Sequence, residues 1–120
     1  MADIVKMTRL GIEGEQKEMA WEYEVTLSSV TTSDAILLPR GINGGVTTIS
    51  FTGTAEGKVQ STSSSFNTIR NGTAIWVDWD AGVVTVTTQD AFSPPPTAIR
   101  LNQTSAGGGA DEATLSLVAQ

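Results

Sequence analysis

The sequence contains no cysteine and no histidine. Without cysteine the chain forms no disulfide and offers no thiolate to a metal ion. Without histidine it lacks the side chain that most often carries protons near neutral pH and most often binds zinc, copper or iron. Together these absences exclude Ser-His-Asp and Cys-His nucleophiles and metal hydrolysis at a histidine-ligated centre.

Basic residues are scarce as well, with 7 Lys and Arg against 13 Asp and Glu and a formal net charge of -6. The cations are spread singly and form no basic stripe, so we expect no nucleic-acid partner. No apolar run approaches the length of a membrane span, and the first residues lack the basic and apolar regions of a secretory signal. We therefore expect no membrane partner and synthesis in the cytoplasm of the host cell.

A length of 120 residues suits one domain. The clearest pattern runs over residues 19–27, where the apolar Trp21 and Tyr23 alternate with the acidic Glu22 and Glu24. This period of two is typical of a half-buried strand whose charged face meets water or a polar partner. Further short segments of strand composition follow at 35–38, 46–52, 58–60, 74–79, 83–88, 97–101 and 113–118.

Two local features complete the prediction of the fold. Residues 73–88 are typical of a hairpin, with arms at 74–79 and 83–88 and a loop at Asp80-Ala81-Gly82. Phe66 and Ile69 are spaced three apart and favour one helical turn near 64–70.

Short strands at such spacing predict an all-β fold, a small antiparallel β-sandwich or barrel of jelly-roll or immunoglobulin-like type with short connections. Residues 19–120 form this domain, and residues 1–18 add an N-terminal strand and an exposed loop to it. Periodicity does not encode the strand order, so both types remain possible at this point.

The candidate site centres on Trp76. In a strand, Ile75, Val77 and Trp79 share one wholly apolar face, which predicts that they point into the core, and Trp76 then points outward beside Asp78. Burying such a ring removes about 150–250 Å² from water, and tryptophan is enriched at interface centres. The alternative is that a loop or a neighbouring strand covers Trp76 within the monomer. The interface residues that we expect are Trp76, Asp78, Arg40, Glu22 and Glu24.

Catalytic and metal sites find little support in the sequence. Asp78, Asp80 and Asp90 do not match the calcium-loop pattern, and no phosphate-binding glycine motif is present. Glu22 and Glu24 share a strand face, but a glycosidase needs a cleft that holds a sugar. We therefore expect no catalytic residue, no metal site and no cofactor, and we predict that the protein is not an enzyme.

Several segments together resemble small virion structural proteins of tailed bacteriophages. The resemblance covers about residues 34–118 and is carried by Leu38-Pro39-Arg40-Gly41, Gly57-Lys58-Val59-Gln60, Gly72-Thr73-Ala74, Trp76-Val77-Asp78-Trp79, 83–88 and 97–101. It implies a capsid decoration (cement) protein, a homotrimer that binds the major capsid protein at the virion surface. The alternatives are a tail or head–tail connector component and a carbohydrate-binding β-sandwich module that stacks sugars on Trp76 and Trp21.

Overall fold

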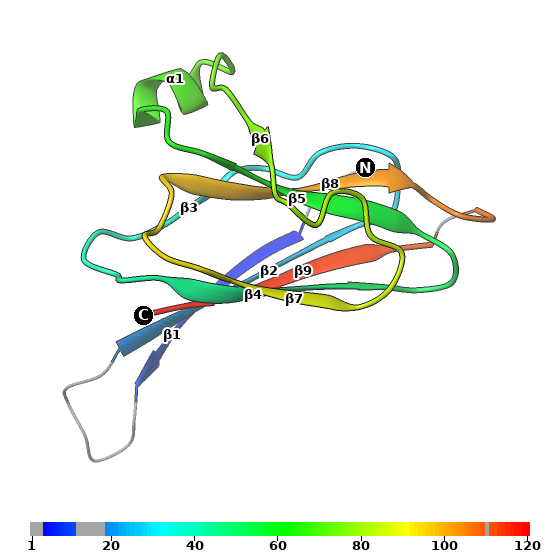
Figure 1. Ribbon diagram of the computed structural model, residues 1–120, viewed down its shortest axis with the longest axis horizontal. Coiled ribbons are helices and arrows are strands. Elements are labelled where there is room, and N and C mark those ends of the chain that lie inside the picture. Colours follow the sequence, from blue (N-terminus) through cyan, green and yellow to red (C-terminus); the bar gives the residue numbers. More distant parts are fainter. Residues whose placement is uncertain (1–3, 12–18, 110) are drawn as a thin grey trace.

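The computed structural model describes residues 4–11, 19–109 and 111–120 (Figure 1). These residues form nine strands and one short helix. The strands are β1 (Ile4–Gly11), β2 (Met19–Leu27), β3 (Ile36–Leu37), β4 (Gly45–Phe51), β5 (Glu56–Thr62), β6 (Val77–Asp78), β7 (Thr88–Phe92), β8 (Ala98–Ser105) and β9 (Ala113–Ala119), and the helix α1 (Phe66–Arg70) lies between β5 and β6. The predicted all-β class and the helical turn near 64–70 are both confirmed. The loop expected at 13–18 lies outside the described residues.

The strands form two antiparallel sheets that pack face to face (Figure 1). One sheet has the order β1-β2-β9-β4-β7 and the other has the order β3-β8-β5-β6. Four antiparallel pairs are nested in the sequence, namely β5 with β6, β4 with β7, β3 with β8 and β2 with β9. Each pair encloses the next one along the chain, and successive pairs alternate between the two sheets. This strand connectivity is that of a double-sheet jelly roll. Of the two predicted types, the topology is therefore that of the jelly roll, with β1 added beside β2.

The hydrophobic core lies between the two sheets and follows the alternation of the strands. In β9, Leu115 and Leu117 are fully buried, and Leu101 of β8 meets the same core from the other sheet. Tyr23 of β2 is buried and Trp21 packs against the core, as the alternation predicts. Glu22 and Glu24 are exposed on the opposite face of β2.

The predicted hairpin over 73–88 is wrong. β6 pairs with β5 in the four-stranded sheet, whereas β7 begins only at Thr88 and pairs with β4 in the five-stranded sheet. The chain between them turns at Gly82, whose N–H donates to the carbonyl of Trp79 at 2.8 Å, and then crosses from one sheet to the other. The two arms have strand composition, but composition does not reveal whether neighbouring segments pair with each other or with more distant strands.

Within the described residues, no helix has the length and apolar character needed to cross a membrane.

Candidate functional site

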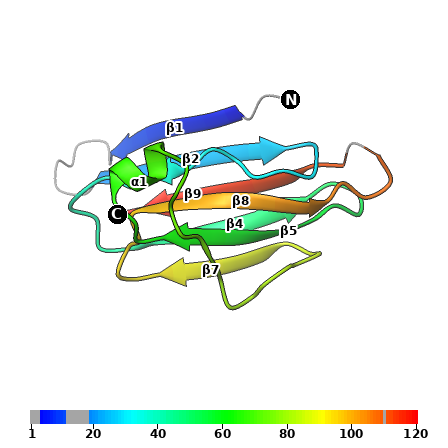
Figure 2. The same ribbon diagram turned by 90° about the horizontal axis from the view of Figure 1, so that it is seen from above.

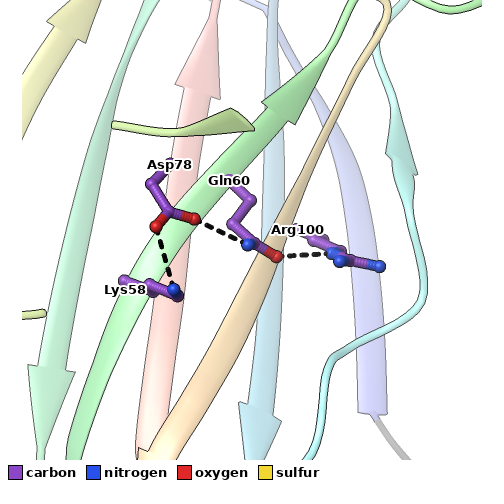
Figure 3. Close-up of polar contacts among 4 residues, drawn as sticks. All are labelled: Lys58, Gln60, Asp78 and Arg100. Atoms are coloured by element: carbon purple, nitrogen blue, oxygen red, sulfur yellow. Dashed lines mark hydrogen bonds and ion pairs between the residues drawn. The ribbon is translucent and has the colours of Figure 1, made fainter. Parts of the chain in front are cut away.

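Four polar side chains lie together on the outer face of the four-stranded sheet (Figure 3). Lys58 and Gln60 come from β5, Asp78 from β6 and Arg100 from β8. The strand register brings them together, because Gln60 lies opposite Arg100 on one side and opposite Asp78 on the other. We call these residues the polar cluster.

Gln60 links the cluster through both ends of its amide. Its Nε2 donates to Oδ1 of Asp78 at 2.7 Å, and its Oε1 accepts from Nε of Arg100 at 2.8 Å. Lys58 Nζ donates to the other carboxylate oxygen of Asp78 at 2.9 Å. The hydrogen bond from Gln60, followed by that from Lys58, holds the pKa of Asp78 below its ordinary value. Asp78 is therefore a carboxylate at neutral pH that ties the two-residue strand β6 to β5.

Trp76 lies over the same face of the sheet. The guanidinium carbon of Arg100 is 4.3 Å from the centroid of the Trp76 ring, a distance at which a cation is attracted to an aromatic face. The tryptophan is half-buried. The Arg100 side chain of β8 therefore lies over one face of this ring.

The segment around β6 leaves several aliphatic side chains in water. The exposed fractions are 75% for Ile75, 59% for Val77, 49% for Val83 and 68% for Val86. We call these four residues the apolar strip.

The prediction that Ile75 and Val77 point into the core with Trp79 is wrong for the first two. Only Trp79 packs against the core, where its ring centroid is 6.1 Å from that of Phe92. Strand β6 is two residues long, so the alternation predicted over 74–79 does not hold along that segment.

A shallow groove of about 300 Å³ lies between β6 and β7, at one margin of the sandwich. Its lining includes Val77 from the apolar strip and the carboxylates of Asp78, Asp80 and Asp90, and it contains no lysine or arginine. Within the described part of the chain, no set of three or more acidic side chains is arranged to hold a metal ion. The Asp78 carboxylate is ion-paired with Lys58, so the groove combines apolar surface with the negative charges of Asp80 and Asp90.

The remaining predicted interface residues lie elsewhere. Arg40 follows β3 and lines a depression beside α1 with Phe66. Glu22 and Glu24 belong to the five-stranded sheet, on its outer face. The structure thus brings together Trp76 and Asp78, and it separates the other three from them.

Sequence reasoning missed Lys58, Gln60 and Arg100. The sequence does contain a pattern that indicates their position. Lys58 and Gln60 flank the buried Val59, and Arg100 lies between the buried Ile99 and Leu101. Alternation places all three on an outer face. Only the pairing of β5 with β6 and β8 shows that they belong to one cluster.

No protein-family model matches the chain, and no curated protein matches it. Among solved structures, that of an oxalate oxidase is similar, with a TM-score of 0.50 and 14% sequence identity. The match covers 96% of this chain and 50% of the oxalate oxidase chain, so this chain spans about half the length of that protein. At this identity the likeness shows the β-sandwich fold alone.

Proposed function

We propose that the chain is a non-enzymatic structural protein of a virion, a decoration protein that self-associates as a trimer and binds the major capsid protein at the capsid surface. The observation that carries the proposal is the apolar strip. Single exposed aliphatic side chains are common, but four of them within residues 75–86 support a role for this segment in binding another protein.

The energetics of the apolar strip support a binding role. Burying apolar surface stabilises a contact by about 25 cal/mol per Å², and a fully buried valine or isoleucine contributes about 1.5–3 kcal/mol. Ile75 and Val86 are the most exposed members of the strip, so a partner that covers them would bury the most apolar surface at these two side chains. A few such contacts give each copy only a modest affinity. Joined copies bind a repetitive shell at a high effective concentration, which raises the affinity of the whole assembly.

The fold is compatible with this function. Double-sheet jelly rolls are found in viral capsid proteins, in lectins and in enzymes. The resemblance of residues 34–118 to virion structural proteins favours the first of these. The exposed aliphatic surface, and not the architecture, therefore supports a binding function.

Co-sedimentation with empty expanded capsid shells tests the proposal. The double variant Ile75→Ser, Val77→Ser removes half of the apolar strip, and we expect its apparent affinity for the shells to fall by about 100-fold, or about tenfold for each side chain. The matched control is Val30→Ser, because Val30 is 63% exposed and lies outside the strip. Equal binding by the wild type and the double variant would contradict a role for the strip, and no binding of the wild type would contradict the proposed function.

The alternatives give different outcomes. A tail or head–tail connector component would be located away from the shell by electron microscopy of assembled particles. A carbohydrate-binding module would bind a glycan array and lose that binding in Trp76→Ala. Against the carbohydrate alternative, Arg100 of the same chain already occupies one face of the Trp76 ring.

A further inference from the structure

The five-stranded sheet has a long free strand at each margin. β1 and β7 end the strand order, and Figure 2 shows them at opposite sides of the sandwich. They are 8 and 5 residues long, whereas the strands at the margins of the other sheet, β3 and β6, have 2 residues each. A long free edge presents unpaired backbone N–H and C=O groups to which another strand can add. Within the described residues, no strand pairs with the outer side of β1 or β7.

The two edges differ in charge. Strand β1 carries Lys6 and Arg9 and no acidic residue. Strand β7 carries Asp90 and no basic residue, and the groove beside it adds Asp80. Two β7 edges would bring like charges together, which disfavours their pairing. A β1 edge beside a β7 edge brings opposite charges together.

We infer that β1 of one copy of this chain adds to the β7 edge of the next copy and extends the five-stranded sheet from subunit to subunit. This inference rests on the self-association in the proposed function, and it names the surfaces that join the copies. The contact is heterologous, since each copy offers one edge and receives the other, and such a contact closes into a ring or continues as a filament. A trimer is then a closed ring of three such contacts.

The sheet topology also determines the direction of the new pair. Four successive antiparallel pairings separate β1 from β7, so these two strands run in the same direction within one sheet. A ring whose axis runs along the strands preserves that direction from copy to copy. The joined β1 and β7 strands are therefore parallel, and backbone hydrogen bonds of the parallel type link them.

Introduced cysteines test the contact directly, because the natural chain has none. Four strand spacings of about 4.8 Å separate β1 from β7, which is about 19 Å within one subunit. A disulfide needs Cα atoms within about 7 Å, so a bond between these strands must join two copies. Thr8 lies opposite Glu22 in the register, and Gln89 lies opposite Thr48. Gln89 is exposed, and Thr8 occupies the register position opposite the exposed Glu22.

The variant Thr8→Cys, Gln89→Cys is expected to form disulfide-linked multimers under mild oxidation. A second pair, Thr8→Cys with Ala91→Cys, samples the register shifted by two residues. The controls are the single variants Thr8→Cys, Gln89→Cys and Ala91→Cys, which are expected to remain monomers on a non-reducing gel. Dimers of either β7 single variant would show that β7 pairs with β7 and would overturn the inference. Monomers in both double variants would overturn it too.

Charge reversal gives an independent measurement by sedimentation. The change Asp80→Lys, Asp90→Lys and the change Lys6→Glu, Arg9→Glu are each expected to weaken self-association by about tenfold, and the two changes combined are expected to restore it. The control is Glu112→Lys, an exposed carboxylate in the turn before β9. Failure of the combined variant to recover would contradict the charge pairing. Crosslinking without capsid binding would refute the proposed partner alone, and capsid binding without crosslinking would refute the edge contact alone.

Discussion

Gln60 is the residue on which the polar cluster depends. It is 7% exposed, and its amide accepts from Arg100 with one end and donates to Asp78 with the other. A surface ion pair such as Lys58–Asp78 contributes little by itself. The buried amide orients the carboxylate, and so the cluster holds β6 against β5.

Asp78 should make the stability of the protein depend on pH in the acidic range. Its pKa is lowered in the folded chain by Gln60 and Lys58, so folding binds fewer protons at this group than the unfolded chain does. Its contribution is fully present above the ordinary pKa of 3.8 and is lost as the pH falls through the lower folded value.

Urea unfolding of the wild type and of Asp78→Asn, followed from neutral pH to about pH 2, measures this contribution. The difference in unfolding free energy is expected to stay constant down to about pH 5 and to shrink below about pH 4. The variant Glu112→Gln, a carboxylate exposed at the end of the sandwich, is the control. A difference that does not change with pH would show that the Asp78 carboxylate is not stabilised in the folded state.

At the scale of single elements, the turns at the end of the sandwich hold β4, β5, β8 and β9 together. The buried Gln103 donates from Nε2 to the carbonyls of Ser105 at 3.1 Å and Asp111 at 2.8 Å. Asp111 in turn accepts from the backbone N–H of Thr54 at 3.0 Å. The turn after β8 is thereby linked to the turn after β4, although the two are distant in sequence.

Gly107 is a residue of this junction with no room for a side chain. Its φ is +61°, and a Cβ there would meet Thr54 and the carboxylate of Asp111. Gly107→Ala is expected to lower the unfolding free energy by about 1–2 kcal/mol or more, because an L-residue is strained in this conformation. Gly108→Ala is the matched control, since a Cβ at Gly108 meets open space. Equal melting temperatures of the two variants would contradict this account of the junction.

At the scale of the whole molecule, the two sheets share one core. Leu101 lies in the four-stranded sheet and Leu115 in the five-stranded sheet, and both are fully buried in the same cluster. A jelly roll interleaves the strands of its two sheets along the sequence, so neither sheet has a contiguous segment that folds alone. Loss of packing in one sheet therefore affects the whole domain.

Leu101→Ala and Leu115→Ala are each expected to cost about 2–5 kcal/mol in denaturant unfolding. We expect a single cooperative transition in both variants, with the same midpoint by tryptophan fluorescence and by circular dichroism. Val30→Ala, at an exposed position, should change stability by less than about 0.5 kcal/mol. Two separate transitions would show that the sheets unfold independently.

Much of the local structure was predictable from the sequence. The strand at 19–27 has its aromatic residues inside and its glutamates outside, and the helical turn begins at Phe66, where Ser65 caps it. These features depend on neighbours within a few residues, which a periodic pattern records directly. The same pattern failed over 74–79, where Ile75 and Val77 are more exposed than the half-buried Trp76.

The sequence alone determined the class of the fold, the positions of most strands and the absence of thiol and imidazole chemistry. Only the tertiary structure decided which strands pair, and with it the jelly-roll winding, the crossing between β6 and β7 and the gathering of Lys58, Gln60, Asp78 and Arg100. It also decided that Ile75 and Val77 face water, since the short strand β6 lies at the margin of its sheet. The physical reason is that alternation specifies which side of a strand is apolar, whereas pairing depends on distant backbone groups that leave no periodic trace in the chain.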